Sequence, residues 1–431
     1  MIIKRFLEEV VGFVISVVLL AVCYVCAIYL RCNNKFDENQ PRLVWGSTPI
    51  INYSCWSRAM AACGYKSETY TEGYYSSINR REDWDRILSE DYPRLPRILR
   101  KMVAFLSCLF RYDIFFTSFD GFFLGSTWFR FHQATILKLA GKKVVVLPYG
   151  SDSYIYRRVR SIYTVHGLLM SYPGAARQQR RIQNQVDYWC ENADAIVTGI
   201  MGPDGFGRWD VLTPCPFGVD LNVWTSSNRG NTANGRDGVV TIAHAPNHRG
   251  FKGTEFIVDA VKKLQQEGLR VDLILIEKKP NAEVRRILQL DTDILVEQIV
   301  ATGHAMNGLE GMASGLPTIC NLEDDDYIMP FRRWSFFGEC PLVSATPETI
   351  VDVLRKIVTR PELRRQLGHA GRAYAEKYHG YDSVQYLFTN VIKYVKGEQE
   401  SLINLYHPLL AEYPNRSPKI SHPLINNRIV D

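Results

Sequence analysis

The sequence has little net charge for its length. Its 51 lysines and arginines are nearly balanced by 45 aspartates and glutamates, which leaves a formal charge of +6 at pH 7. Nucleic-acid-binding proteins concentrate more basic residues on one face, so we expect no nucleic acid among the partners. Hydrophobic residues make up 46% of the 431 positions, which excludes overall disorder and favours two or three domains with buried cores.

Cysteine pairs that would indicate disulfides or a zinc site are also lacking. Most of the ten cysteines lie in apolar runs, where a thiol behaves as a small hydrophobe. The one Cys-x-x-Cys, Cys23 and Cys26, lies inside a long hydrophobic stretch rather than after a strand. We therefore predict reduced cysteines.

Charge is absent from Val10 to Leu30, a run of 21 residues. As a helix this run would span about 31 Å, which matches the hydrocarbon core of a bilayer. A cleaved signal peptide would have a shorter apolar region and a small-residue cleavage site. We predict an N-terminal membrane anchor over residues 1–35, with a single helix over about 10–30.

The next part of the chain alternates apolar runs with helical stretches such as Ser54–Gly64. This alternation predicts a parallel sheet covered by helices, in a first Rossmann-like domain over 42–225. The predicted strands are Arg42–Ser47, Tyr112–Ser118, Lys142–Pro148 and Asp194–Gly199.

A Gly- and Asn-rich linker, Ser226–Asp237, precedes a second α/β domain predicted over 238–385. Its order βαβαβαβ requires a doubly wound sheet. We predict strands at Val239–Ala243, Val271–Glu277, Asp293–Ile299 and Pro317–Leu322, with helices between them. Residues 386–431 are predicted to form a C-terminal helix and an extended or disordered tail. The fold class is α/β, with two Rossmann-like domains facing a central cleft.

Two loops of the second domain carry candidate binding residues. The first follows the strand Val239–Ala243, and its Arg249, Lys252 and Gly253 at a helix start suit a diphosphate, although a solvated basic turn explains them equally well. The second runs from Thr302 to Pro317 and holds Glu310 on a small, apolar helix. A carboxylate there needs hydrogen-bond donors such as ribose hydroxyls, unless it is a capping or packing-edge glutamate.

The sequence also contains the segment Pro216–Asp220 (PFGVD). This segment and the two loops follow one another in a particular order along the chain. Lys252-Gly253 follows the first strand of the domain, and Leu309–Thr318 (LEGMASGLPT) follows the third. The combination resembles the donor lobe of the glycogen-synthase-like, retaining glycosyltransferases of GT-B fold, the group 1 or family 4 type. The similarity covers roughly Asp194 to Tyr378.

The resemblance implies transfer of a sugar from a nucleotide-diphosphate sugar to a saccharide or lipid-linked acceptor, with retention, in cell-surface polysaccharide or glycolipid synthesis. A membrane scaffold without activity and a nucleotide-sugar epimerase of similar architecture are the alternatives. Bacterial nucleotide sugars are cytoplasmic, and Lys and Arg are slightly more frequent after the anchor than before it. Both points favour a single-pass membrane protein with its catalytic domains in the cytoplasm.

By this resemblance Arg249 and Lys252 bind the diphosphate and Glu310 the ribose. The loop Thr302–Asn307, with Gly303 and His304, would contact the sugar and its phosphate. The family has a glutamate eight positions before Glu310, where this sequence has Thr302. Either Thr302, His304 and backbone amides contact the sugar instead, or Glu297 takes over, or activity is lost.

The first domain offers two further candidates. Asp152, in Leu147–Asp152 (LPYGSD), resembles a Gly-Ser-Asp turn at the cleft of the family and would hold or deprotonate an acceptor hydroxyl, or else cap a helix. Gly46 lies in the first strand-to-helix turn, where phosphates approach the backbone in this fold class, but a plain turn explains it nearly as well.

Acidic residues are absent between Ser153 and Val186, a stretch that contains six arginines. This stretch favours contact with anionic headgroups or a lipid diphosphate, and an ordinary solvated helix face is the alternative. The acidic run Glu323–Asp326 follows a strand of a domain that already has a cationic diphosphate site, so we expect a surface loop there. No metal or cofactor is predicted beyond the donor substrate.

Overall fold

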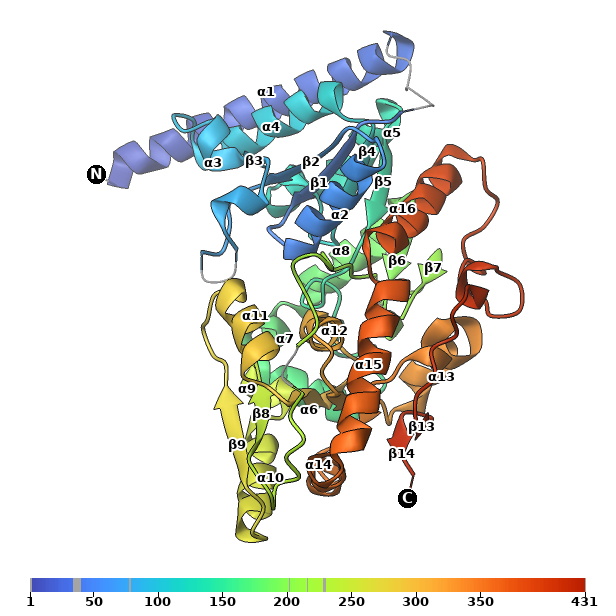
Figure 1. Ribbon diagram of the computed structural model, residues 1–431. Helices are drawn as coiled ribbons and strands as arrows, with labels where there is room; N and C mark the ends of the chain where they lie inside the picture. Colours follow the sequence, from blue (N-terminus) through green and yellow to red (C-terminus); the bar gives the residue numbers. More distant parts are fainter. Residues whose placement is uncertain are drawn as a thin grey trace.

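Two parallel sheets form the two halves of the molecule (Figure 1). The computed structural model describes residues 2–33, 40–76, 79–200, 202–214, 216–227 and 230–430. The first sheet has the order β3-β2-β1-β4-β5-β6-β7, and the second has the order β12-β11-β10-β8-β9. Both are covered by helices, which confirms the predicted pair of Rossmann-like lobes.

The strands of the first sheet are short, and the central ones are fully buried because helices cover both faces. They are β1 (Leu43–Ser47), β2 (Ser67–Thr71), β3 (Arg86–Ile87), β4 (Ile114–Thr117), β5 (Lys143–Val146), β6 (Ala195–Thr198) and β7 (Val211–Leu212). The helices of this lobe are α2 (Ile51–Ala62), α3 (Leu88–Asp91), α4 (Arg97–Arg111), α5 (Gln133–Leu139), α6 (Ile162–Ser171), α7 (Pro173–Arg177) and α8 (Gln179–Asn192).

The second lobe follows the predicted alternation of strands and helices. Its strands are β8 (Val240–His244), β9 (Val271–Leu275), β10 (Ile294–Thr302), β11 (Thr318–Asn321) and β12 (Val343–Ser344). Its helices are α9 (Arg249–Lys252), α10 (Thr254–Gln266), α11 (Asn281–Leu290), α12 (Met306–Ala313), α13 (Asp325–Trp334), α14 (Ile350–Thr359) and α15 (Pro361–Tyr378). Strand β10 runs further than predicted and is buried along its whole length.

Each sheet has one point where the chain reverses the direction in which strands are added. In the first sheet this point lies between β1 and β4, and in the second between β8 and β10. Ligands of open α/β sheets bind outside the carboxyl ends of the strands at such points. The fold therefore marks two places for a functional site, one in each lobe.

The C-terminal helix α16 (Tyr381–Lys396) returns from the second lobe to pack against α2 of the first. Its Phe388 lies edge-on to Trp45, with ring centroids 4.8 Å apart, and Trp45 stacks on Phe116 at 3.8 Å. The last helix of the chain thus completes the core of the first lobe.

The segment after α16 is ordered in the structure, whereas the sequence led us to expect an extended or disordered tail. It forms a small hairpin of β13 (Leu424–Ile425) and β14 (Arg428–Ile429). At the hairpin turn, the Asn427 side-chain amide donates to the carbonyls of Cys340 and Leu342, at 2.8 and 3.0 Å. These partners lie more than 80 residues away in the chain, so no local pattern indicates them.

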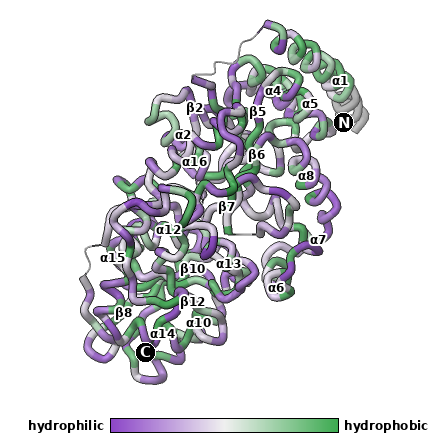
Figure 2. The backbone as a smooth tube through the Cα atoms, turned by 90° about the vertical axis from the view of Figure 1, so that its right-hand side faces the viewer, coloured by the Kyte–Doolittle hydropathy of each residue, from purple (hydrophilic) through white to green (hydrophobic). Residues whose placement is uncertain are grey.

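The N-terminal helix α1 (Ile2–Asn33) packs against α4 and α5 on the outside of the first lobe (Figures 1 and 2). Its part from Gly12 to Asn33 is long and apolar enough to cross a membrane, with a mean hydropathy of 2.7. The predicted anchor is thus present as a helix, although such a helix can equally be a core helix of the lobe.

We predict that Phe388→Ala destabilises the protein by about 3 kcal/mol, because it leaves a cavity beside Trp45 and Phe116. Chemical denaturation followed by tryptophan fluorescence measures the loss. Phe256→Ala is the matched control, since Phe256 on α10 is 50% exposed. Equal losses for the two variants would contradict the role assigned to α16.

Candidate active site

The reversal point of the second sheet holds a buried ion pair. Lys252, the last residue of α9, has only 6% of its surface exposed, and its ammonium pairs with the Glu297 carboxylate of β10. The same ammonium donates to Gln298 Oε1 at 2.7 Å. A fully buried lysine requires such partners, because an unpaired buried charge is very costly.

An irregularity in β10 brings both partners to Lys252. Successive residues of a regular strand point to opposite faces of the sheet, so Glu297 and Gln298 would normally diverge. The pairing of β10 with β11 shifts register between Val296 and Gln298, which places an extra residue at Glu297. Such a bulge redirects side chains, and here both neighbours reach the same ammonium.

Several buried polar atoms around this pair have no partner among the described residues. They are Glu297 Oε2, Thr302 Oγ1, His304 Nε2 and Asn307 Oδ1. A buried polar atom without a hydrogen bond costs about 1–3 kcal/mol, so such atoms are rare in stable folds. Four of them within eleven residues of chain are typical of a site that binds a polar ligand.

Glu310 lies in this neighbourhood but already has two donors. Its carboxylate accepts from the side-chain amides of Asn281 at 3.0 Å and Asn307 at 3.2 Å. Burial raises the pKa of Glu310 from its usual value of 4.5 to about 7, and the two amides oppose that rise only in part. Hydrogen bonds between Glu310 and ribose hydroxyls stay a prediction.

Arg249 does not join the Lys252 cluster. Its guanidinium is partly exposed and pairs at 2.8 Å with both Glu255 and Glu277. The sequence analysis assigned Arg249 and Lys252 to one diphosphate because both lie at the helix start after the first strand of the lobe. In the short helix α9, one side chain faces the surface and the other the interior, so a shared diphosphate would require Arg249 to leave its two carboxylates.

The two candidate glycines of this lobe are required for close packing. A Cβ at Gly253 would lie 2.7 Å from Ile299 Cγ1, and one at Gly303 would lie 2.7 Å from Ile200 Cγ2. Both also have positive φ angles, of 79° and 90°, which disfavour other residues. Because Ile200 belongs to the first lobe, Gly303 lets the two lobes approach each other.

Helix α6 of the first lobe closes the space in front of the cluster. The Phe251 N–H donates to Ser171 Oγ at 2.9 Å, and the Tyr163 hydroxyl donates to the carbonyl of Ile299 at 3.0 Å. Between the lobes remains a cavity of about 10 Å³, lined in part by Thr302. A ligand much larger than this cavity would therefore reach the Lys252 cluster only if α6 moved away from α9 and β10.

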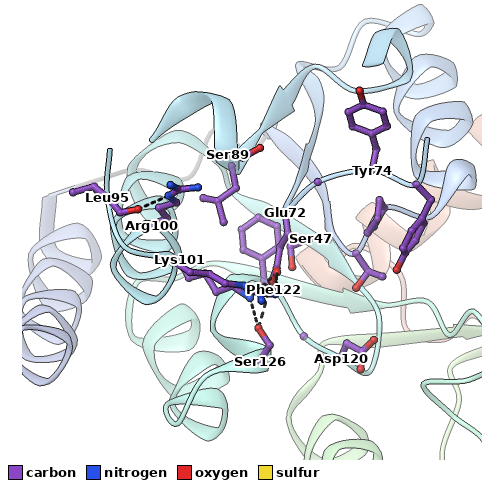
Figure 3. A pocket seen from close by; sticks show the side chains of 18 of the residues that line it. Ser47, Glu72, Tyr74, Ser89, Leu95, Arg100, Lys101, Asp120, Phe122 and Ser126 are labelled. Atoms are coloured by element: carbon purple, nitrogen blue, oxygen red, sulfur yellow. Dashed lines mark hydrogen bonds and ion pairs between the residues drawn. The ribbon is translucent and has the colours of Figure 1, made fainter. Parts of the chain in front are cut away.

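A second candidate site lies at the reversal point of the first sheet. It is a pocket of about 650 Å³ at the carboxyl ends of β1, β2 and β4 (Figure 3). Its lining includes Ser47, Glu72, Arg100, Lys101, Asp120 and Ser126. On its wall the buried ammonium of Lys101 donates to both oxygens of Glu72 at 2.6 Å and also contacts Ser126.

Asp152 is not among the residues that line this pocket, and it holds a loop. Its buried carboxylate accepts from the backbone N–H groups of Phe119 at 3.0 Å, Tyr149 at 2.9 Å and Gly150 at 3.0 Å. Burial and the nearby Asp120 raise the pKa of Asp152 to about 7. These bonds fix a loop and do not cap a helix, because the next helix, α6, begins only at Ile162. The catalytic role of Asp152 stays a prediction.

Asp120 lines the pocket together with Glu72, and the sequence analysis missed it. It accepts from the Tyr149 hydroxyl at 2.6 Å and follows β4, at the reversal point of the sheet. The position of an acidic residue after a predicted strand was the available signal. Gly46 is explained by packing, because a Cβ there would lie 2.0 Å from the carbonyl oxygen of Tyr70.

The arginines of the arginine-rich, acid-free stretch lie in different settings, and their contact with anionic headgroups or a lipid diphosphate stays a prediction. Arg158 lies in a turn and pairs with Asp187 of α8 at 2.7 Å. Arg181 is exposed and lines the first-lobe pocket. In the acidic run, Glu323 pairs with Arg428 of the C-terminal hairpin.

Comparison with solved structures identifies the architecture. The Anabaena protein HepE, solved with UDP-glucose, matches 81% of this chain and 98% of its own at 11% identity, with a TM-score of 0.50. The chain has the GT-B fold. A sucrose-phosphate synthase from Thermosynechococcus elongatus matches 84% of this chain and 100% of its own at 12% identity, with a TM-score of 0.49.

At these identities the likeness shows the GT-B fold alone. No family model and no curated protein matches the sequence. The Lys252 cluster lies at the carboxyl end of the second sheet and the 650 Å³ pocket at that of the first, so each GT-B lobe contributes one candidate site.

We predict that Glu310→Gln makes stability less dependent on pH. The folded protein holds the Glu310 proton up to about pH 7, whereas the unfolded chain releases it near pH 4.5, so folding binds a proton across that window. The stability of the wild type should therefore fall by up to about 3 kcal/mol more than that of the variant as pH rises through it. Thermal unfolding at a series of pH values measures this, with the exposed Glu400→Gln as control. Parallel curves for wild type and Glu310→Gln would contradict the buried, protonated carboxyl.

Proposed function

We propose that the protein is a glycosyltransferase that transfers a sugar from a nucleotide-diphosphate sugar to a saccharide or lipid-linked acceptor. The buried ammonium of Lys252, surrounded by unpartnered polar atoms at the reversal point of the second GT-B sheet, is the observation that supports this most directly. A cation in a dry site stabilises the negative charge that develops on a leaving diphosphate.

In this proposal the donor diphosphate takes the place of Glu297 at Lys252. Because a phosphate and a carboxylate both accept hydrogen bonds from an ammonium, the exchange keeps Lys252 neutralised. Glu297 is then free to contact the sugar. It would take the role of the family's glutamate, whose position is occupied by Thr302 in this sequence. Thr302 and His304 lie beside it with one unpartnered atom each. Burial lowers the pKa of His304, which keeps its ring neutral and able to donate to or accept from a sugar hydroxyl.

The acceptor enters the first-lobe pocket in this proposal. Asp120 is the group best placed to hold or deprotonate its hydroxyl, since it lines the pocket and its carboxylate is oriented by a hydrogen bond from the Tyr149 hydroxyl. Arg97 and Arg100 on the pocket wall suit an acceptor with phosphate groups. Retention of the anomeric configuration through front-face attack is part of the proposal, as is a role in cell-surface polysaccharide or glycolipid synthesis.

Helix α1 attaches the enzyme to a membrane, with both lobes on the cytoplasmic side where nucleotide sugars are made. The apolar length of α1 and its place on the outside of the first lobe support this attachment. Nucleic acid has no part in the proposed reaction, and no metal is required because Lys252 provides the positive charge.

The donor site is tested with Lys252→Met combined with Glu297→Gln. Lys252→Ala alone would leave a buried carboxylate without its partner and would destabilise the fold, whereas the double variant removes both charges at similar volume. We expect wild type to be stabilised by one member of a nucleotide-sugar panel that includes UDP-glucose, and the variant to lose at least about 100-fold in turnover with little change in melting temperature.

The exposed Lys262→Met, on α10, is the matched control and should behave like wild type. Absence of stabilisation by every nucleotide sugar would reject the donor assignment. Binding without transfer or hydrolysis would instead favour the scaffold alternative.

The acceptor site is tested with Asp120→Asn. We expect transfer to fall at least about 100-fold, the usual contribution of a general base, while stabilisation by the donor persists. Asp237→Asn in the exposed linker is the control. Unchanged transfer in Asp120→Asn would remove this residue from the reaction, whereas loss of donor binding would show that the variant disturbs the other lobe.

A further inference from the structure

Helix α1 has one face that fits the first lobe closely. Its buried residues recur at intervals of three or four, or their sums, which places them on one stripe of the helix. They are Gly12, Ser16, Cys23, Ala27 and Leu30. Four of the five are small, so the helix axis can approach its neighbours closely. We call this stripe the docked face.

The docked face contacts the lobe along most of the helix. Near the start, a Cβ on Gly12 would lie 3.9 Å from Ile98 of α4, and Phe13 stacks near Phe129 with centroids 6.3 Å apart. In the middle, the Tyr24 hydroxyl lies 2.8 Å from His132 Nδ1. Near the end, the Arg31 guanidinium lies beside Gly141, after α5.

The opposite face of α1 is apolar and exposed, and we call it the outer face. Its large side chains are Val14, Ile15, Val17, Val18, Val22, Val25, Ile28 and Tyr29, each at least 37% exposed. Trp128 next to Phe129 is 80% exposed. Tryptophan is enriched where proteins meet the headgroup region of a membrane. Such a continuous apolar strip is too large for an ordinary soluble surface and indicates a lipid partner.

A docked α1 is poorly suited to cross the bilayer. Helix α4 lies alongside α1 (Figure 1), and a vertical α1 would carry α4 into the hydrocarbon region with it. Exposed charges of the lobe would enter too, including Arg97 and Arg111 of α4 and Lys138 of α5. Charged side chains facing lipid at membrane depth are strongly disfavoured. If α1 lies flat, only its outer face enters the lipid.

We propose that α1 lies in the plane of one leaflet of an anionic membrane, with its outer face among the acyl chains and its docked face on α4 and α5. This inference rests on the proposed membrane attachment and replaces the single-pass span predicted from the sequence. The basic residues Arg97, Arg111 and Lys138 then lie at headgroup level, where they attract anionic lipids.

The flat orientation also brings the first-lobe pocket to the membrane surface. Ile98 touches α1, while its neighbours Arg97, Arg100 and Lys101 line the pocket. These residues lie within a single turn of α4. An acceptor held in the leaflet by a lipid tail reaches the pocket without leaving the membrane.

Spin-label depth measurements on the full chain test this orientation. The background carries serine at the exposed Cys32 and Cys63. Single cysteines are then introduced on the outer face, in turn at Val14, Val18, Val25 and Ile28. The protein is bound to vesicles of phosphatidylcholine and phosphatidylglycerol, and nitroxide depth is measured from oxygen and nickel-complex accessibility. A flat helix predicts similar, shallow depths at all four sites. A spanning helix predicts that Val18 and Val25 lie deepest and that the ends are shallow, which would overturn the flat orientation but not the membrane attachment.

A double variant that adds two charges to the outer face tests the membrane attachment itself. Val18→Asp with Val25→Asp should weaken vesicle binding at least about tenfold, because it places two carboxylates on the inserted face. The melting temperature should not change, since both side chains are exposed. Phe256→Asp, an exposed apolar residue of the other lobe, is the matched control. No vesicle binding by the wild type, or equal binding by the double variant, would overturn both the attachment and the orientation, and neither outcome bears on nucleotide-sugar binding.

Discussion

The Lys252–Glu297 ion pair is the interaction on which the second lobe depends. Both groups are buried, so neither charge is tolerable without the other. The bulge in β10 aligns Glu297 and Gln298 on the same ammonium, and this alignment gives the lobe a buried cation at the end of its sheet. In the proposed function this cation binds the donor diphosphate, and the carboxylate partner stabilises it while the donor is absent.

The region around the Lys252 cluster also forms the contact between the two lobes. Gly253 and Gly303 leave room for Ile299 and Ile200, and hydrogen bonds from Phe251 and Tyr163 hold α6 over the cluster. The closed arrangement excludes water from the site, which strengthens electrostatic interactions within it. In the proposed function the lobes separate for the donor to enter, so the strength of the α6 contact should influence the rate of donor binding.

In the proposed orientation on a membrane, one helix joins the first-lobe pocket to the membrane-facing helix α1. One side of α4 packs on α1, and its first turn lines the pocket that holds Asp120. The lobe is completed from the other end of the chain, because Phe388 of α16 lies in the aromatic cluster around Trp45. The two lobes are therefore not independent units, and truncation before α16 would remove part of the first core.

The sequence by itself determined the two α/β lobes, because buried strands and amphipathic helices leave a local pattern of apolar residues. It also indicated the apolar helix at the N-terminus and the segments around Lys252 and Glu310. Tertiary structure alone decided which side chains meet. A bulge in β10 directs Glu297 and Gln298 to Lys252, and Arg249 pairs with two glutamates at the surface. Asp152 accepts hydrogen bonds from three backbone amides, whereas Asp120 lines the pocket. Some of these contacts join residues distant in the chain, some depend on one irregular strand, and the local ones depend on loop conformation. None of the three leaves a periodic signal in the sequence.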